Sequence, residues 1–327
     1  MVITYLFGAG ASCNALPIVN QIPQRLDLMV DRLTSNEFEF NSEESHENIS
    51  KVDLLQDLLK DLRWLRDSCE NHASVDTFAK KLYLKSNHDE LSRLKFALSI
   101  FLVFEQIINQ ADKRYDAFFA SILNDDYERL PNNIKVISWN YDSQFEKSYS
   151  EYTDIDELQR NRAMLRISTK KSSSRPRTPG FNIVKLNGSH NIIDHSGHKS
   201  YDFCPTGDVF NRKAMDAILK NYATSKVKKN LFSSGLSFAW EKEDNIIDFA
   251  KEISFDTNIL VVIGYSFPYF NRDVDRAIIK NMQNLQKVYF QSPEALALKE
   301  RFSTIRNDIK DLVSISDVNQ FYLPDEL

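Results

Sequence analysis

The stretch Val2-Ile3-Thr4-Tyr5-Leu6-Phe7-Gly8-Ala9-Gly10-Ala11-Ser12 joins a short apolar run directly to two closely spaced glycines. Val, Ile, Tyr and Phe favour a buried strand, and glycines at a strand end let backbone N–H groups approach a phosphate. A helix that begins after such a turn adds positive potential. The stretch therefore predicts a first strand followed by a nucleotide phosphate loop. The third glycine of the full dinucleotide fingerprint would fall at Cys13, so the motif also fits loops that bind no nucleotide.

The length, composition and charge of the chain limit the classes of protein to which it can belong. The chain has 327 residues, of which 42% are hydrophobic, and a formal net charge of −5. This length allows one large domain or a domain with a substantial insertion. No apolar run approaches the roughly eighteen residues that a membrane helix needs, and the start lacks a basic leader, so we expect a cytoplasmic protein without membrane contact. The acidic balance argues against direct binding of nucleic acid.

Three isolated cysteines, Cys13, Cys69 and Cys204, form no CxxC motif. This spacing argues against a disulfide framework and against a four-cysteine zinc module. One stretch does hold residue types that ligate metals: His190, Asp194, His195, His198 and Cys204. Its spacing matches no familiar zinc pattern, so we expect a polar loop and no metal site, with elemental analysis of the purified protein as the test.

Residues 159–180 form a local exception to the acidic balance. They contain no acidic residue, and their basic side chains are interleaved with Ser and Pro: Arg160, Arg162, Arg166, Lys170, Lys171, Arg175 and Arg177. Such a composition cannot bury a core, so we expect a solvated loop. A contact with a polyanion or a partner is the alternative.

A helical block follows the glycine-rich loop. Apolar residues recur at helical spacing in residues 26–33, 54–65, 76–82, 89–110 and 115–123. The block separates the first strand from the next by about 120 residues, which is longer than an ordinary crossover. We therefore predict a helical subdomain, about residues 20–130, inserted into one domain that spans residues 1–327.

Apolar strands alternate with helices in the rest of the chain. We expect strands at 134–138, 181–186, 258–263 and 287–291. We expect helices at 211–222 and 243–253, and further helices that begin at 271 and 293. Near-continuous apolar strands of this kind predict an α/β fold with a doubly wound, mostly parallel, Rossmann-like sheet. Ligands of such sheets bind beyond the carboxyl ends of the strands, so we expect one cleft at the strand exits.

A dehydrogenase would also begin with a glycine loop. It requires an acidic residue for the ribose about twenty positions on, at the end of a second strand. Asp27 and Asp31 have that spacing but belong to the helical pattern of residues 26–33. We therefore expect a solvated helix face there, and the hypothesis of a hydride-transferring enzyme loses most of its support.

Taken together, the strand ends resemble the sirtuin-like superfamily, in particular its bacterial, zinc-free branch that hydrolyses NAD. The first stretch, followed by Leu16-Pro17, looks like the family's nucleotide loop, and Ser138-Trp139-Asn140-Tyr141-Asp142 is similar to its Gln-Asn-Ile-Asp-type motif. Lys185-Leu186-Asn187-Gly188-Ser189 stands where the family usually has Leu-His-Gly-Ser. Gly264-Tyr265-Ser266-Phe267, with residues 271–275, resembles its later nucleotide-ribose loop and helix. The resemblance spans residues 8–275 but leaves the helical block uncovered.

The resemblance implies that NAD is the substrate and that its nicotinamide–ribose bond is cleaved to give ADP-ribose and nicotinamide. Asn140 would hydrogen-bond the attacking water and the ribose, and Asp142 would accept from the nicotinamide carboxamide. In the alternative interpretation, both residues form a turn or a helix cap after a strand. The NAD-binding residues that the resemblance implies are Gly8, Ala9, Gly10, Ala11, Ser12, Gly188, Gly264, Tyr265, Ser266 and Ser292.

Asn187 departs from the family pattern, because an amide cannot take up a proton near neutral pH. Three interpretations stay open. Hydrolysis proceeds on positioning alone, or His190 swings past Gly188 into the role of the base, or the site binds NAD or ADP-ribose without turning it over. We place hydrolysis first and protein deacylation well behind it.

The resemblance also implies a biological setting. Many bacterial members of this branch are toxic effectors of anti-phage defence, held inactive until a partner or an assembly triggers them. We therefore expect an NADase effector that forms a homo-oligomer or works with a partner defence protein of the ATPase or nuclease type. The alternative is an NAD or ADP-ribose sensor module in a larger complex. The sequence leaves the trigger, the oligomeric state and the partner open.

Overall fold

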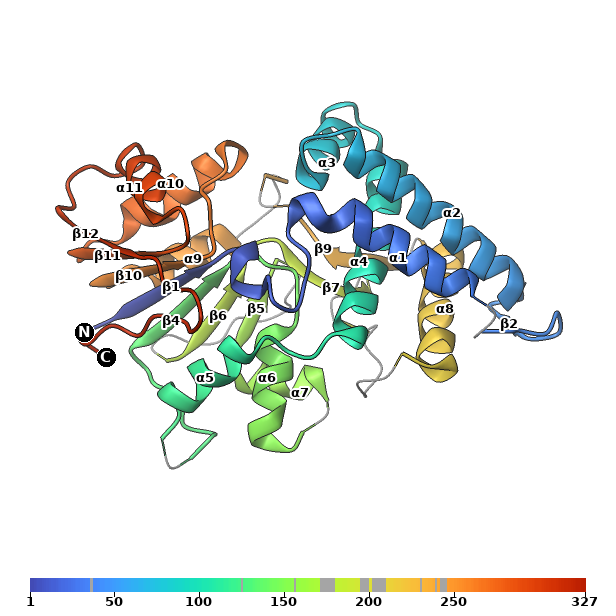
Figure 1. Cartoon of the computed structure of the whole chain (residues 1–327), viewed down its shortest axis with the longest axis horizontal. Coiled ribbons are helices and arrows are strands. Elements are labelled where there is room, and N and C mark those ends of the chain that lie inside the picture. The colour runs from blue at the N-terminus through green and yellow to red at the C-terminus, as the bar shows by residue number, and fades with distance from the viewer. Residues whose placement is uncertain are drawn as a thin grey trace. The chain divides into compact units, whose positions relative to one another are not determined.

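The structure is a computed structural model that describes residues 1–35, 38–124, 126–155, 157–170, 180–194, 200–201, 210–229, 231–238, 240–241 and 246–327. The chain divides into two compact units. Unit 1 comprises Met1–Cys13, Ala111–Gly188 and Ser237–Leu327. Unit 2 comprises Asn14–Gln110 and Ser189–Leu236. Figure 1 labels the elements of both units.

A seven-stranded sheet forms the centre of unit 1 (Figure 1). Its strands, in spatial order, are β12 (Asp311–Ile315), β11 (Lys287–Gln291), β10 (Ile259–Ile263), β1 (Ile3–Phe7), β4 (Ile134–Ser138), β6 (Asn182–Lys185) and β5 (Ile167–Thr169). Every neighbouring pair is parallel. The predicted α/β fold with a mostly parallel sheet is therefore confirmed.

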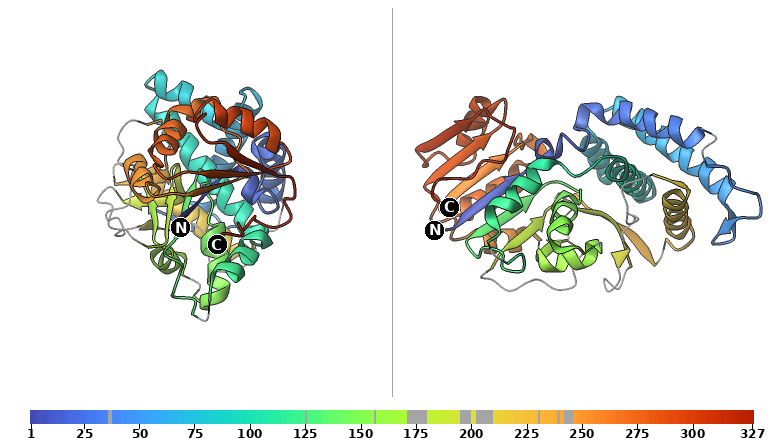
Figure 2. Two further views of the ribbon diagram at one scale, coloured as in Figure 1. Left: turned by 90° about the vertical axis from the view of Figure 1, so that its left-hand side faces the viewer. Right: turned by 60° about the horizontal axis from the view of Figure 1, so that its bottom comes forward.

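Helices cover both faces of this sheet (Figure 2). The helices of unit 1 are α5 (Lys113–Ile122), α6 (Gln144–Thr153), α7 (Leu158–Met164), α9 (Ile246–Ile253), α10 (Arg272–Asn281) and α11 (Ala295–Ser303). Successive side chains of a strand point to opposite faces, so Tyr5 and Phe7 pack in one apolar cluster with α5 and α6. Leu6 packs in the other, with α9, α10 and α11. Burial on both faces explains why the central strands have near-continuous apolar sequences.

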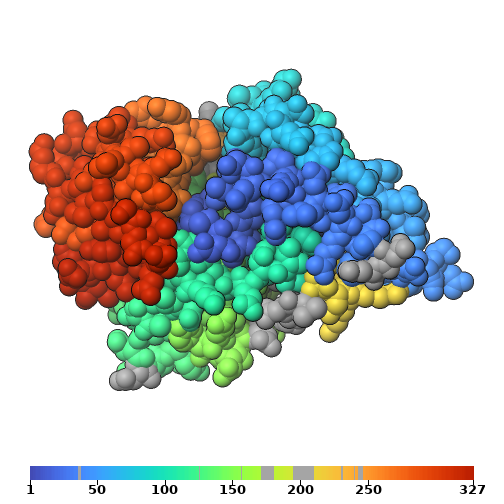
Figure 3. Space-filling view, viewed as in Figure 1, coloured from blue at the N-terminus to red at the C-terminus, as the bar shows by residue number. Residues whose placement is uncertain are grey.

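Unit 2 is mostly helical. Its helices are α1 (Ile22–Thr34), α2 (Lys51–Glu70), α3 (Val75–Leu84), α4 (His88–Ile108) and α8 (Arg212–Val227). It also holds the hairpin β2–β3 (Ser45–His46, Ile49–Ser50) and a sheet of three strands, β8 (Ser200–Tyr201), β7 (Gly188–Asp194) and β9 (Phe232–Leu236). Most residues of helix α4 are buried. Helices α1 and α2 pack against each other, and their surfaces adjoin in Figure 3, in two shades of blue.

The unit boundaries differ from the predicted insertion of about residues 20–130. Unit 2 takes residues 14–110 from this part of the chain and adds residues 189–236, so its chain is in two segments. Helix α5 belongs to unit 1, because Tyr115, Phe118 and Phe119 pack against Tyr5 and Phe7 of β1. Periodicity predicts that a helix exists but not which surface it packs on.

Asp27 and Asp31 lie in helix α1, as predicted, and Asp27 accepts a hydrogen bond from Arg66 at 2.6 Å. Within the described ranges, no helix has the length and apolar character needed to cross a membrane. The prediction of a solvated loop at 159–180 is wrong for part of the stretch, which lies in helix α7 and in strand β5 at the edge of the sheet. Residues 171–179 lie outside the described residues.

Candidate functional site

The loops that follow β1 and β10 touch through glycine. Gly264 has a φ of +59°, and an added Cβ there would lie 2.3 Å from the Ala11 nitrogen. A Cβ on Gly8 would lie 2.7 Å from the Gly264 carbonyl oxygen, and one on Gly10 would lie 2.8 Å from the Gly264 Cα. Backbone bonds join the loops, since Gly8 N donates to Ile263 O at 3.0 Å and Gly10 N donates to Gly264 O at 2.9 Å. Only glycine fits so close an approach of two backbones.

The loop after β1 forms a short 3₁₀ helix, η1 (Ala9–Ser12). Three amides predicted to face a phosphate donate within the protein, because Ala11 N bonds to Gly8 O at 2.9 Å in addition to the Gly8 and Gly10 bonds. Arg114 holds the loop from the other side, since its Nη2 donates to the carbonyl oxygens of Gly10 and Ala11 at 3.2 and 3.0 Å. The glycines therefore allow the loops after β1 and β10 to pack together, and their role in phosphate binding stays a prediction.

Three predicted residues form one buried, hydrogen-bonded group, the strand-exit cluster: Ser12, Asn140 and Asp142. Ser12 Oγ donates to Asp142 Oδ2 at 2.8 Å and accepts from Asn140 Nδ2 at 3.2 Å. Asn140 Nδ2 also donates to Gly8 O at 3.0 Å, and Tyr115 Oη lies 2.9 Å from Ser12 Oγ. All three cluster residues are buried. The parallel strands β1 and β4 end side by side, which brings together residues that lie about 130 positions apart in the chain.

Burial raises the pKa of the Asp142 carboxyl, although Lys185, the Ser12 hydroxyl and the Gln144 amide lower it. Ser12 bonds one carboxyl oxygen, and Gln144 N donates to the other at 3.2 Å. The carboxyl is therefore fixed in orientation while its ionised form is disfavoured by the loss of water. A cationic group brought next to it would favour ionisation.

A buried ion network holds the backbone of Asp142. Lys185 Nζ donates to the Asp142 carbonyl oxygen at 2.5 Å and to Glu146 Oε1 at 2.7 Å, and Arg162 Nε bonds the same oxygen of Glu146 at 2.9 Å. Burial opposes ionisation of Glu146, but the charges of Lys185 and Arg162 lower its pKa to about 2. Glu146 and Arg162 were missed as part of the site. A lysine inside the apolar strand 182–185 was the available signal, since a buried lysine requires a partner.

A second buried pair, Asp112 and Arg114, was also missed. Arg114 Nη2 lies 2.5 Å from Asp112 Oδ2, and Asp112 caps helix α5 by accepting from Arg114 N at 3.1 Å. The Asp112 carboxylate holds the Arg114 guanidinium in place, and the guanidinium donates to carbonyl oxygens of η1. Nothing in the sequence around residue 112 indicates this contact, because α5 reaches the loop only through its packing on the sheet.

Tyr265, in the loop after β10, contacts both the residue that follows β4 and helix α10. The Tyr265 ring stacks on Trp139, with centroids 5.6 Å apart and an interplanar angle of 11°. Its hydroxyl donates to Asp275 at 2.9 Å and accepts from Asn271 Nδ2 at 3.2 Å. Burial raises the pKa of Asp275 to about 8, against the opposing effects of Tyr265 and Trp139. The Trp139 Nε1 nevertheless forms no hydrogen bond of normal geometry in the described structure.

The remaining predicted residues lie at other strand exits. Asn187, after β6, donates from Nδ2 to Trp139 O at 3.2 Å, and Gly188 has a φ of +75°. Ser266 is exposed, and Ser292, after β11, donates its amide to Ile315 O at 3.1 Å. His190 is fully buried in β7 of unit 2, so its proposed movement into the site stays a prediction.

The metal interpretation concerned residues that the structure covers only in part. His195, His198 and Cys204, and the side chain of Asp194, lie outside the described residues. In the portion that is described, no group of three or more His, Cys, Asp or Glu side chains has the arrangement of a metal site.

No protein-family model and no curated protein matches the chain. Among solved structures, the chain is similar to one described as the crystal structure of a Sir2 homolog–NAD complex. The TM-score is 0.40 and the sequence identity is 12%, over 96% of this chain and 83% of that chain. A TM-score and a sequence identity this low do not assign the chain to a family. The parallel sheet with its cluster of polar strand exits is established by the structure of the chain itself.

Proposed function

We propose that the strand exits of unit 1 bind NAD and that water cleaves its nicotinamide–ribose bond there, giving ADP-ribose and nicotinamide. The observation that carries the proposal is the strand-exit cluster of Ser12, Asn140 and Asp142. The sequence motifs that hold these residues are the ones that resemble the sirtuin-like NAD-hydrolysing branch. Ligands of parallel α/β sheets bind at this edge, beyond the carboxyl ends of the strands.

Positioning of water is the role that we propose for Asn140. Its Nδ2 donates to Gly8 O and Ser12 Oγ, which fixes the plane of the amide. The covalent geometry of the amide then sets the direction of Oδ1, an acceptor suited to a water O–H or a ribose hydroxyl. A water held at the anomeric carbon gains from proximity and orientation rather than from added charge.

Charge stabilisation is the role that we propose for Asp142. Cleavage of the nicotinamide–ribose bond builds positive charge on the ribose. A carboxyl in a water-poor site interacts more strongly with such a charge than one in bulk water. Its raised pKa means that the developing cation, when present, shifts the group toward its ionised form.

Asn187 stands where the family usually has a histidine, and the proposal must work without that base. Attack on an oxocarbenium-like carbon needs little base catalysis, because the carbon is already strongly electrophilic. Hydrolysis is therefore compatible with an amide at this position, whereas transfer of the sugar to an acyl oxygen is not favoured. His190 stays the alternative base.

A second candidate function is a sensor that binds NAD or ADP-ribose and releases nothing. The observation that favours it is the Asn187 amide, which donates to Trp139 O and cannot accept a proton. Titration of the full chain with NAD, while released nicotinamide is followed by chromatography, separates the two candidates. A sensor binds NAD and releases no nicotinamide.

The variant Asn140→Ala tests the enzyme proposal directly. Loss of a group that positions the reacting water should reduce nicotinamide release by about 10²-fold or more. Asn132→Ala is the matched control, because Asn132 is exposed and lies before β4, at the opposite end of the strand from Asn140. Equal, negligible rates in the wild type and both variants would remove the enzyme claim.

The finer biological predictions stand on the resemblance alone. These are an anti-phage effector, a cytoplasmic location, and a homo-oligomer or a partner of the ATPase or nuclease type. NAD depletion in infected cells that carry the wild type but not Asn140→Ala would support the effector role.

A further inference from the structure

Tyr115 is a buried tyrosine of helix α5 whose hydroxyl reaches the strand-exit cluster. Its ring is fully buried and packs against Phe7, Phe145 and Phe321, with ring centroids 5.9, 4.7 and 4.9 Å away. The three rings come from distant parts of the chain, so they hold the Tyr115 ring from several sides. Its hydroxyl oxygen lies 2.9 Å from Ser12 Oγ, its hydrogen-bond partner in the described part of the chain. Packing of the ring therefore fixes where this hydroxyl meets Ser12.

The direction of the hydrogen bond between the two hydroxyls follows from their neighbours. Burial and the charge of Asp142 raise the pKa of the Tyr115 phenol well above its ordinary value, so the phenol keeps its proton. The Ser12 hydroxyl has a single proton, and it donates this proton to Asp142 Oδ2 at 2.8 Å. Tyr115 is therefore the donor and Ser12 Oγ the acceptor.

The hydrogen-bonding capacity of the Ser12 hydroxyl is fully used inside the protein. A serine hydroxyl has one proton and two lone pairs. The proton goes to Asp142, Asn140 Nδ2 donates to one lone pair at 3.2 Å, and Tyr115 donates to the other at 2.9 Å. This arrangement suits a residue that orients the Asn140 amide and the Asp142 carboxyl rather than one that contacts a ligand through its hydroxyl.

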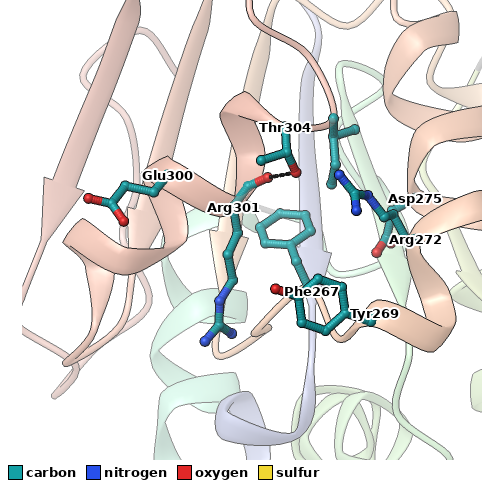
Figure 4. A pocket seen from close by; sticks show the side chains of 8 residues that line it. Phe267, Tyr269, Arg272, Asp275, Glu300, Arg301 and Thr304 are labelled. Carbon is teal, nitrogen blue, oxygen red and sulfur yellow. Dashed lines mark hydrogen bonds between the residues drawn. The ribbon is translucent and has the colours of Figure 1, made fainter.

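A second buried carboxyl of unit 1 has a comparable set of partners. Asp275 lines a pocket of about 220 Å³ beside the loop after β10 (Figure 4). It accepts from the Tyr265 hydroxyl at 2.9 Å, and that hydroxyl accepts from Asn271 Nδ2 at 3.2 Å. The order of amide, hydroxyl and carboxyl is the same as in the strand-exit cluster, where Tyr115 adds a second donor to the hydroxyl. A hydroxyl that accepts hydrogen bonds is polarised and becomes a stronger donor, so Tyr115 strengthens the hydrogen bond from Ser12 to its carboxyl.

We propose that Tyr115 is a positioning residue of the proposed NAD site: through Ser12, its hydroxyl holds the Asn140 amide and the Asp142 carboxyl in the orientation in which they meet NAD. Tyr115 is fully buried and acts through Ser12 without contact to NAD. The inference rests on the proposed function, because it concerns the same site.

The variant Tyr115→Phe keeps the buried ring and removes the hydroxyl. In nicotinamide release from NAD, its kcat should fall about three- to tenfold, the effect of one lost hydrogen bond, while KM stays within about twofold of the wild type. The acidic limb of its pH–rate profile should also move to higher pH. The reason is that a less polarised Ser12 hydroxyl stabilises the ionised form of Asp142 less and so raises the pKa of that carboxyl further.

Tyr149→Phe is the matched control. Tyr149 is equally buried in the same apolar cluster, but its hydroxyl donates to Tyr127 O at 2.7 Å, outside the strand-exit cluster. Its loss should lower stability, as the loss of the Tyr115 hydroxyl does, and leave kcat and the pH–rate profile unchanged. The comparison therefore separates positioning of the site from a merely structural hydrogen bond.

Urea denaturation of a double-mutant cycle with Ser12→Ala tests the contact without NAD. In the wild-type background Tyr115→Phe should lower the equilibrium constant for folding by about threefold or more. In the Ser12→Ala background the phenol has already lost its acceptor, so its removal should leave that constant unchanged or raise it. If the wild type releases no nicotinamide, the proposed function fails, and the cycle alone supports or overturns the role of Tyr115 in holding Ser12. The proposal is overturned if Tyr115→Phe has the kcat and pH–rate profile of the wild type, if only its KM changes, or if it lowers the folding constant equally in both backgrounds.

Discussion

Replacement of Asp275 by Asn should make the protein more stable at neutral and alkaline pH. Asp275 is buried in helix α10 and accepts a hydrogen bond from the Tyr265 hydroxyl at 2.9 Å, an interaction that an Asn carbonyl oxygen can keep. Burial holds its pKa at about 8 in the folded protein, whereas an Asp in an unfolded chain ionises near 3.9. Asn has the same shape and no charge to desolvate.

The size of the effect follows from proton linkage. Between about pH 4 and pH 8 the folded state holds a proton on Asp275 that the unfolded state has lost, so stability falls as the pH rises. Each pH unit in this window costs about 1.36 kcal/mol, which gives about 4 kcal/mol at pH 7 as the upper limit. The free energy of unfolding of Asp275→Asn should therefore match that of the wild type near pH 4 and exceed it by about 2–4 kcal/mol at pH 7.

Urea denaturation at pH 4, 5.5, 7 and 8.5 measures the effect. Asp273→Asn is the matched control, because Asp273 is in the first turn of the same helix but exposed. Its effect should stay within about 0.5 kcal/mol of the wild type at every pH, the size of a helix-terminus charge effect. A difference between Asp275→Asn and the wild type that does not change with pH would refute the reasoning.

Three further predictions concern the same unit. Gly264→Ala should destabilise the protein by about 2–5 kcal/mol in chemical denaturation, because it adds left-handed strain and a Cβ 2.3 Å from the Ala11 nitrogen; a change below about 1 kcal/mol would contradict the close approach of the two loops. Lys185→Met should cost about 3–5 kcal/mol by removing a partner of buried Glu146, with the loss reduced in the double variant with Glu146→Gln; a pair of additive effects would argue against the network. Ser12→Ala should lower nicotinamide release from NAD while costing only about 1–3 kcal/mol of stability, and unchanged turnover would remove Ser12 from the site.

The central strands were predictable because both of their faces are buried. The strands at 134–138 and 287–291 have the predicted bounds, since their buried apolar residues end where the strand ends. No strand was predicted at β12, where the sequence Asp-Leu-Val-Ser-Ile mixes polar and apolar residues and the side chains are only partly buried. An edge strand has weaker burial, and its sequence pattern is correspondingly weak.

The strand-exit cluster was predictable for a related reason. Asn140 and Asp142 follow β4 directly, and Ser12 follows β1, so recognition of two parallel strands placed all three at one edge. Tyr115 and Arg114 were not predictable in this way. They lie on α5, and only the packing of that helix on the sheet brings them to the loop after β1.

A crystal structure of the full chain soaked with NAD tests the central claim most directly. We predict density for the nicotinamide ribose within hydrogen-bond distance, about 3 Å, of the Asn140 side chain, with the rest of the molecule passing between the loops after β1 and β10. Density that avoids Gly8, Asn140 and Gly264 would contradict the account.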